Sequence, residues 1–561
     1  MQPSETTPVR AFPLRVQQTI ASPALGALKP FANRESKKWL LSNAAQGPVF
    51  RIFLLTLVTV CVHGYHLGVD DSGIYLPAVL KAIHPDLYPY GSEFFLSHAR
   101  LSLFAEVVGA SARIPHRLIV PFLIAAFNDD LVIFLWHFAT IFLFLLAVWQ
   151  LASALFTTNR ARWSAILVSA ATLTVPVAGT ALVIMDPYLT ARSASTPFTV
   201  FAVAAWIRGK RSLALLWIAL AFLVHPLMAA EGLFCLGFLA IPARWTARAF
   251  RTSVDKGAIP AFAVLTVPFP FGPVSPAYRQ AISMRRFLFL SRWGWREWLG
   301  VAAPIAILVR LGQLNPRGAS RLFSRTSRAL ALFGIFATVT GLLFSVGPAA
   351  ERLAWLQPMR AFQLIYIVLL LLLGGLLGEY VLKSRGWLWI IFFAFLAGGM
   401  FSIQRATFAD SRHIEWPWAA PKNSWVAAFQ WIRDYTPQNA VFALDPVYIV
   451  LPGEDQHGFR AIARRSMLSD YYKDSGVVSV FPRLAEEWQR EQQAQQGWKS
   501  FDLDDFQRLA REYPVSWVVL QGTVPAGLTC PYRNQAVAVC SIPGAIGLDT
   551  NHGATGRHRS P

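Results

Sequence analysis

Long apolar stretches that recur from Val49 to Ser402 constrain this chain more than any other feature. A membrane-spanning helix needs about 20 apolar residues, and fewer where it is tucked inside the protein. Eleven segments approach that length: Val49–Gly68, Leu131–Phe156, Trp163–Met185, Ser195–Ile207, Leu213–Val224, Leu227–Ile241, Gly257–Phe271, Leu299–Leu311, Ala329–Val346, Ala361–Leu382 and Trp387–Ser402. The sequence therefore predicts an α-helical polytopic membrane protein with about 11 spans.

The connectors between these segments give an orientation. Every second connector is basic, and these connectors together carry fifteen Lys and Arg but one acidic residue, Asp255. The remaining connectors hold most of the acidic residues. Because cytoplasmic loops carry the excess of Lys and Arg, we expect a cytoplasmic N-terminus. An odd number of spans then places the C-terminus on the opposite, non-cytoplasmic face.

Charge and composition divide the chain into four parts. Residues 1–47 are polar and basic, and we expect a disordered cytoplasmic tail. Residues 48–403 form the transmembrane region, with a long first outside loop at 69–130. Together with the tail they carry the whole net charge of +20, because the chain from residue 404 on has 16 basic and 16 acidic residues. This distribution argues against nucleic-acid binding, which needs a basic patch on a soluble module.

Residues 404–548 are predicted to form a small extracytoplasmic α/β domain, followed by a disordered tail at 549–561. Apolar residues recur at helical spacing in Trp425–Tyr435, and two further helices are expected at 484–496 and 503–513. Strands are expected at 440–444, 515–521 and 536–541. Cys530 and Cys540 bracket a strand-turn-strand, where they form either a disulfide, which an oxidising compartment would maintain, or two free thiols.

The first outside loop opens with two adjacent carboxylates, Asp70 and Asp71, directly after a span. Carboxylates at the rim of a span are costly unless they are solvated, paired or used. This pair is a candidate general base toward a sugar hydroxyl or a candidate ligand set for a divalent cation. The alternative is a solvated helix end, where Asp is common as an N-cap. Glu93 in the same loop is a further candidate.

Two more outside connectors hold polar groups at the same rim. Asp186 and Arg192 either pair with each other or leave Arg192 facing a shared cavity, where it holds an anion. His225 makes the outside turn between two short spans. A structural, hydrogen-bonded role is the alternative reading for His225.

The outside connector at residues 272–298 breaks the charge pattern. It carries five arginines and a single acid: Arg279, Arg285, Arg286, Arg292, Arg296 and Glu297. It is either an interfacial helix whose arginines reach lipid head groups or a phosphate clamp, since Arg presents a planar fork to phosphate oxygens. Arg464 and Arg465 in the C-terminal part either close over an anionic head group or belong to a solvated surface with local salt bridges.

The layout resembles the bacterial GT-C superfamily of polyprenyl-phosphate-dependent membrane glycosyltransferases. The matching features are an acidic pair that opens a long first outside loop, about eleven spans and an outside α/β domain. The segments Leu189–Ser193, His225–Ala229 and Trp431–Pro437, together with Arg464-Arg465, are similar to those of bacterial proteins with this layout.

The resemblance implies an integral protein of the bacterial inner membrane whose C-terminal domain is periplasmic. Such an enzyme transfers a sugar from a polyprenyl-phosphate donor to a glycan, lipid or protein acceptor. Asp70 or Asp71 is then the catalytic base or a ligand of Mg or Mn, and a metal-free mechanism is equally open. Arg192 and the arginines from Arg279 to Arg296 are the candidates that hold the donor phosphate.

Two other functions compete with this one. The first is a non-catalytic assembly or export factor whose periplasmic domain binds a partner. The second is a transporter, for which internal repeats and matching intramembrane polar sites are expected. The sequence shows neither feature clearly.

Overall fold

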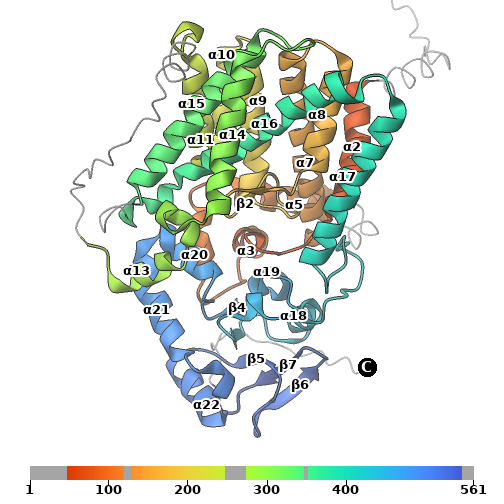
Figure 1. Cartoon of the computed structure of the whole chain (residues 1–561). Coiled ribbons are helices and arrows are strands. Elements are labelled where there is room, and N and C mark those ends of the chain that lie inside the picture. The colour runs from red at the N-terminus through yellow and green to blue at the C-terminus, as the bar shows by residue number, and fades with distance from the viewer. Residues whose placement is uncertain (1–46, 119–127, 247–272, 346–350, 546–561) are drawn as a thin grey trace, which may run out of the picture. The chain divides into compact units, whose positions relative to one another are not determined.

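The computed structural model of the chain describes residues 47–118, 128–246, 273–345 and 351–545 (Figure 1). From Ile52 on, the chain forms one compact unit. Most of this unit is helical. A small five-stranded sheet lies in the C-terminal part.

Apolar helices make up the first part of the unit. In chain order they are α2 (Pro48–His63), α7 (Asp129–Leu155), α8 (Asn159–Ala171), α9 (Ala191–Ile207), α10 (Arg211–Val224), α11 (Pro226–Ala240), α14 (Trp295–Gln313), α15 (Leu322–Leu343), α16 (Ala361–Leu376) and α17 (Gly386–Thr407). Helix α16 continues into a π-helical segment, η6 (Leu377–Leu382), and is preceded by the short η4 (Ala354–Leu356) and η5 (Pro358–Arg360). The largest apolar core is built mainly from α7, α8, α9, α15 and α16.

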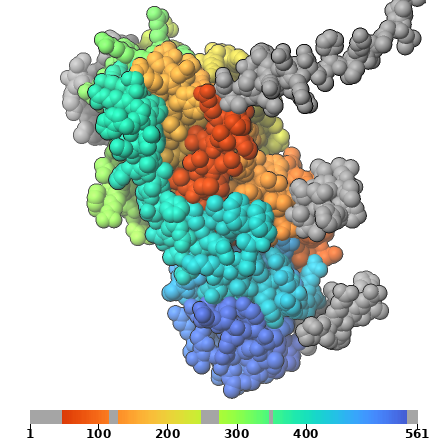
Figure 2. Space-filling model, turned by 90° about the vertical axis from the view of Figure 1, so that its right-hand side faces the viewer, coloured from red at the N-terminus to blue at the C-terminus, as the bar shows by residue number. Residues whose placement is uncertain are grey.

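Four helical segments of the described residues are long and apolar enough to cross a membrane: Asp129–Leu155, Leu322–Leu343, Ala354–Leu382 and Gly386–Thr407. The last of these, α17, is almost entirely exposed and runs along the surface beside α2 (Figure 2). An apolar helix that the protein itself does not cover is typical of a lipid-facing position.

The expected number of about 11 spans is not found among the described residues. Several predicted segments are helices shorter than the roughly 20 residues that a bilayer requires, such as α10 and α11. The segment Trp163–Met185 is not one helix, because α8 ends at Ala171 and the chain then forms the two-stranded ribbon of β1 (Pro176–Val177) and β2 (Leu182–Val183). The predicted span Gly257–Phe271 lies outside the described residues.

The first loop, predicted at 69–130, contains three helices in its described part. These are α3 (Ser72–Ile83), α4 (Glu93–Ala99) and α5 (Phe104–Leu118). Apolar side chains of α3 and α5 share a core with α18, α19 and β3 of the C-terminal part. The acidic loop is therefore packed between the apolar helices and the C-terminal part.

The C-terminal part has the α/β character predicted from the sequence. Its helices are α18 (Ser424–Tyr435), α19 (Phe459–Ala463), α20 (Lys473–Val480), α21 (Ala485–Ala494) and α22 (Leu503–Glu512), with the short η7 (Tyr448–Val450), η8 (Pro482–Leu484) and η9 (Trp498–Ser500). Its strands are β3 (Val441–Leu444), β4 (Ser466–Met467), β5 (Trp517–Gln521), β6 (Thr529–Arg533) and β7 (Val537–Ser541).

The sheet has the order β4-β3-β5-β7-β6. Strand β3 pairs in parallel with β4 and β5, whereas β7 is antiparallel to both β5 and β6. A disulfide joins Cys530 of β6 to Cys540 of β7. Helix α13 (Pro276–Ser283) and the short η1 (Arg286–Leu288) and η2 (Leu290–Arg292) belong to the arginine-rich connector. This connector packs against α20 and α21.

Candidate functional site

Backbone pairing with the C-terminal part fixes the loop that carries the two adjacent carboxylates. The amide of Tyr65 donates to the carbonyl of His413 at 3.1 Å, and the amide of Asp70 donates to the carbonyl of Gln456 at 2.9 Å. Gly458 donates to the carbonyl of Gly68 at 2.8 Å. Asp70 itself has a left-handed backbone with φ of 51°. Such a conformation is uncommon for a non-glycine residue, and Asp tolerates it better than most.

Asp71 is bonded to Arg192, and Arg192 to Asp186. Nη1 of Arg192 donates to Oδ2 of Asp71 at 2.8 Å, and Nη2 donates to both carboxylate oxygens of Asp186 at 2.8 Å. The Arg192 and Asp186 side chains are only 3% and 1% exposed, whereas Asp71 is 32% exposed. Asp186 also accepts hydrogen bonds from the hydroxyls of Thr190 and Ser193. Asp186 is thus fully occupied in holding Arg192, and Arg192 holds Asp71.

Local sequence explains how Arg192 reaches this position. Thr190 is the N-cap of α9, and its hydroxyl accepts a hydrogen bond from the amide of Ser193 at 3.0 Å. This cap fixes the start of the helix at Ala191, so that Arg192 lies in its first turn. Of the two readings left open by the sequence, the structure shows the pairing of Arg192 with Asp186, and Arg192 also bonds to Asp71.

Asp70 has different partners. The hydroxyl of Tyr188 donates to Oδ2 of Asp70 at 2.8 Å. The ammonium of Lys473, at the start of α20, is paired with Oδ1 of Asp70 and lies 3.5 Å from Oδ1 of Asp71. The two carboxylates thus share one lysine from the C-terminal part.

The surrounding arginines keep Asp71 ionised. Burial would raise the pKa of the Asp71 carboxyl, but the charge and hydrogen bond of Arg192, with the charges of Arg360 and Arg285, lower this pKa below its ordinary value. Asp71 is therefore ionised at neutral pH, which is the form in which a carboxylate can accept a proton.

Two of the surrounding arginines have no carboxylate partner. No Asp or Glu of the described residues lies within 4.0 Å of the guanidinium of Arg285 or Arg360. Arg285 donates to the hydroxyl of Ser475 at 3.1 Å, and Arg360 donates to the side-chain oxygen of Gln357 at 2.6 Å. The buried Nε of Arg285 has no hydrogen-bond partner in the described part of the chain. Both arginines are partly buried, and a partly buried cation without a counterion is costly, so each of them is suited to bind an anion.

His225 contacts the same group of residues through Tyr75 of α3. Nδ1 of His225 accepts a hydrogen bond from the amide of Met228 at 3.3 Å and so caps α11. The neutral ring then carries its proton on Nε2, which lies 3.3 Å from the hydroxyl of Tyr75. This tautomer follows from the hydrogen-bond pattern. His225 therefore combines the structural role with a position at the site.

Other residues predicted for the site lie elsewhere. Arg279 pairs with Glu351 at 3.2 Å, and the exposed Arg286 donates to the carbonyl of Arg292 at 3.1 Å. Glu93 is paired at the surface with Arg100 and Arg483 at 2.7 and 2.9 Å. The arginine-rich connector therefore contributes only Arg285 to the region of Asp71.

The two adjacent arginines of the C-terminal part have separate structural partners. Arg465 donates to the carbonyls of Arg433 and Thr436 at 2.8 and 2.7 Å and thereby caps the end of α18. Arg464 pairs with Asp129 and Asp130 at 2.7 and 3.0 Å. Neither reaches the acidic pair.

The donor set at the acidic pair does not fit a Mg or Mn ion. Within the described ranges no group of three or more His, Cys, Asp or Glu side chains is arranged to hold a metal. Lys473 also lies against both Asp70 and Asp71 and supplies the positive charge that a cation would bring. We therefore assign no chemical step to a metal.

Several site residues were not singled out from the sequence. Lys473 lies in the polar segment Asp470–Asp474, for which the sequence leaves open a role in closing over an anionic head group or a solvated surface. Tyr75 and Tyr188 belong to no recognisable sequence motif. Arg360 directly precedes a predicted span, where a basic residue is common. No spacing rule could have joined these residues, since their contacts depend on tertiary structure.

The chain matches no family model, and no curated protein sequence matches it. The functional argument therefore depends on the geometry described above.

Proposed function

We propose that this protein is a membrane glycosyltransferase that resembles the GT-C superfamily and uses a polyprenyl-phosphate-linked sugar as donor. The observation that carries the proposal is the ionised Asp71 carboxylate held by Arg192, with the unpaired guanidiniums of Arg285 and Arg360 acting on it. This arrangement offers a proton acceptor and two guanidiniums whose charges act on it. Transfer of a sugar from a phosphate needs both.

The donor phosphate binds to Arg285 and Arg360 in this proposal. Guanidinium groups bind phosphate oxygens through paired hydrogen bonds. Arg360 directly precedes α16, and a polyprenyl chain can extend along the apolar helices. Arg192 was expected to hold the phosphate, but its hydrogen bonds to Asp186 and Asp71 give it a positioning role instead.

The reaction follows from these positions. Asp71 accepts the proton of an acceptor hydroxyl as the hydroxyl oxygen forms a bond to the anomeric carbon of the sugar. The bond between that carbon and the phosphate oxygen breaks, and its electron pair leaves with the polyprenyl phosphate. Arg285 and Arg360 stabilise the charge that develops on the phosphate. Asp70, which is 33% exposed and paired with Lys473, is the alternative base.

The site lies on the periplasmic face of the bacterial inner membrane in this proposal. The distribution of Lys and Arg among the connectors supports that orientation. The Cys530–Cys540 disulfide also supports it, because structural disulfides persist in oxidising compartments.

A non-catalytic assembly or export factor is the second candidate. The observation in its favour is that the charges of the site are paired within the protein. Arg192 pairs with Asp71 and Lys473 with Asp70, as in a structural ion network. A catalytic role and a structural role predict different results for a substitution that keeps shape but removes a charge.

The test is Asp71→Asn in the purified full-length protein, assayed in nanodiscs for release of polyprenyl phosphate from a polyprenyl-phosphate sugar. A general base contributes about 10²- to 10⁴-fold to a rate, so we expect a loss of at least about 100-fold with unchanged membrane insertion. Glu93→Gln changes a surface carboxylate of the same loop and serves as the control with full activity. Equal activity of Asp71→Asn and the wild type would remove the enzymatic proposal.

A further inference from the structure

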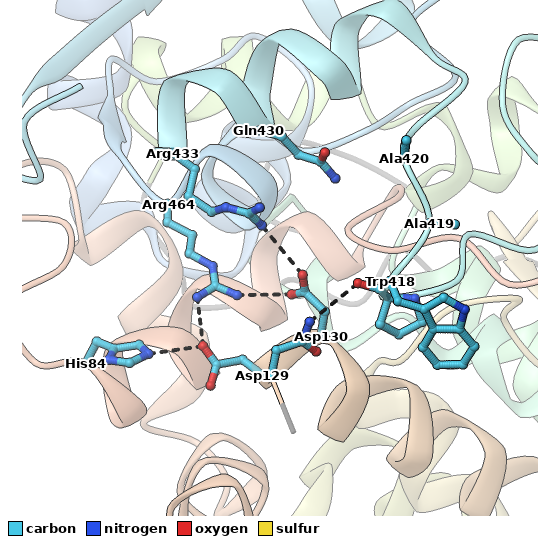
Figure 3. Close-up of a pocket in the computed structure, with 11 residues that line it drawn as sticks. His84, Asp129, Asp130, Trp418, Ala419, Ala420, Gln430, Arg433 and Arg464 are labelled. Atoms are coloured by element: carbon cyan, nitrogen blue, oxygen red, sulfur yellow. Dashed lines mark hydrogen bonds and ion pairs between the residues drawn. The ribbon is translucent and has the colours of Figure 1, made fainter. Parts of the chain in front are cut away.

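A pocket lies at the start of α7, and neither Asp70 nor Asp71 lines it. Its volume is about 580 Å³, within the roughly 300–1,000 Å³ that is typical of small-molecule sites. It is bordered by α7, α18, the residue after α19 and the segment that follows α17 (Figure 3).

One wall of the pocket is a network of ion pairs between arginines and carboxylates. Arg464 donates to Asp129 at 2.7 Å and to Asp130 at 3.0 Å, and Arg433 lies 3.6 Å from Asp130. His84 bonds to the same oxygen of Asp129 at 3.0 Å (Figure 3). Among the lining groups two carboxylates balance two guanidiniums, and Arg433 makes its shorter ion pair, at 2.9 Å, with Asp434 outside the lining. A charged ligand gains little from such a wall, whereas hydroxyl groups find fixed donors and acceptors.

The backbone conformation of Arg464 is a second feature of this wall that is typical of functional sites. Arg464 follows α19 with a left-handed φ of 53°. A non-glycine residue in this region stores strain, and such residues concentrate at functional sites. The conformation directs the guanidinium toward the start of α7, where it meets both carboxylates.

Aromatic and amide groups complete the pocket. Trp418 is 69% exposed and stacks on Trp416, with ring centroids 5.3 Å apart and an interplanar angle of 18°. Trp416 in turn packs edge-on against Phe134 of α7 at 5.4 Å. The side-chain amide of Gln430 points into the pocket (Figure 3), and no described residue forms a hydrogen bond with it.

We propose that this pocket binds a neutral sugar. A sugar ring has a C–H face that stacks on an indole ring, and its hydroxyls exchange hydrogen bonds with carboxylates, amides and guanidiniums. Trp418, Gln430 and the polar wall of Asp129, Asp130, Arg433 and Arg464 match these two requirements. Sugar binding here is independent of the catalytic proposal. Its assignment as the site of a glycan acceptor rests on that proposal.

The competing explanation for the tryptophan pair is an anchor at the membrane interface. Tryptophan is enriched at the level of lipid head groups, and Trp416 and Trp418 follow the apolar helix α17. An anchor requires the ring but not the polar wall. A sugar site requires both, and the test uses this difference.

The experiment measures binding of neutral di- to hexasaccharides to the full-length protein in nanodiscs, first on an oligosaccharide array and then as a Kd for the best binder. We expect Trp418→Ala to weaken binding at least about fivefold through the loss of stacking, and Gln430→Ala to weaken it as well. Trp387→Ala removes a similarly exposed tryptophan at the first turn of α17 and should leave the Kd unchanged. Asp71→Asn should also leave it unchanged, which separates this inference from the catalytic one.

Three results would overturn the inference. These are the absence of binding by any neutral oligosaccharide, an unchanged Kd in Trp418→Ala, and an equal loss in Trp387→Ala. Binding of glycerophosphoethanolamine in place of oligosaccharides would assign the pocket to a lipid head group instead.

Discussion

A buried ion pair between Glu415 and His457 ties the acidic loop to the C-terminal part. Nε2 of His457 lies 2.9 Å from Oε1 of Glu415, and Oε2 of Glu415 accepts a hydrogen bond from the amide of Leu67 at 2.9 Å. Burial alone would lower the pKa of His457, but Glu415 raises it to about 9. Burial alone would raise the pKa of Glu415, but His457 lowers it to about 2.

These pKa values set the size and the pH range of the effect. Each differs by about 2.5 from the ordinary value of 6.5 or 4.5, which corresponds to about 3 kcal/mol. The two differences report one interaction and are not added. The contribution of His457 is complete below pH 6.5 and is lost as the pH rises through about 9. That of Glu415 is present above pH 4.5 and is lost as the pH falls through about 2.

Glu415→Gln tests this pair, because glutamine keeps the shape and the hydrogen bond to Leu67 but removes the charge. For a chain of this size, about 3 kcal/mol corresponds to a change in Tm of about 3 °C. We expect the variant to unfold about 3 °C below the wild type at about pH 6, and the difference to shrink below about 1 °C at about pH 9.5. The measurement is thermal unfolding of detergent-purified protein, followed by intrinsic tryptophan fluorescence.

Two neighbouring groups act on the pair itself, because Glu454 raises the pKa of His457 and His66 lowers that of Glu415. Burial raises the pKa of Glu454, but this residue is present in both proteins. Glu351→Gln breaks a half-exposed pair with Arg279 and should change the Tm by less than about 1 °C at both pH values. A Tm difference that is the same at both pH values, or no difference at about pH 6, would refute the reasoning.

Two further predictions follow from close contacts. In Gly476→Ala the new Cβ would lie 2.7 Å from Nη2 of Arg285, so the guanidinium must move. Native mass spectrometry should then show at least about fivefold weaker binding of polyprenyl phosphate, whereas Gly399→Ala, where nothing lies within 4 Å, should bind normally. Dithiothreitol should lower the Tm by about 2–3 °C, because the Cys530–Cys540 disulfide closes a short loop worth about 2–3 kcal/mol. Equal binding by both glycine variants, or an equal response to dithiothreitol in the Cys530→Ser/Cys540→Ser variant, would contradict these predictions.

The C-terminal part was predictable because its signals are local. The strand predicted at 440–444 is β3 at Val441–Leu444, and the helix predicted at Trp425–Tyr435 is α18 at Ser424–Tyr435. The strand-turn-strand between Cys530 and Cys540 is the pair of β6 and β7. In contrast, β4 has only two residues and leaves no periodic pattern to recognise.

The number of about 11 spans is not confirmed in the described residues, because an apolar run does not distinguish lipid from protein interior. The segment Trp163–Met185 is apolar because α8 packs into the main core. The ribbon of β1 and β2 that follows is largely covered as well. Hydropathy reports only that such residues avoid water.

The sequence placed Asp70, Asp186, Arg192 and His225 at one rim, since each follows or joins apolar segments on the same side. It could not show which of these residues touch. Lys473 lies 402 positions from Asp71, so their contact depends on how the C-terminal part packs against the acidic loop. The pairing of Arg192 likewise depends on the helix that Thr190 caps.

Cryo-electron microscopy of the full-length protein in nanodiscs saturated with polyprenyl monophosphate tests the central claim most directly. We predict phosphate density in contact with the guanidiniums of Arg285 and Arg360 and beside the Asp71 carboxylate, with the lipid chain along the apolar helices. Phosphate density at a different place, with Arg285 and Arg360 left uncontacted, would contradict the account.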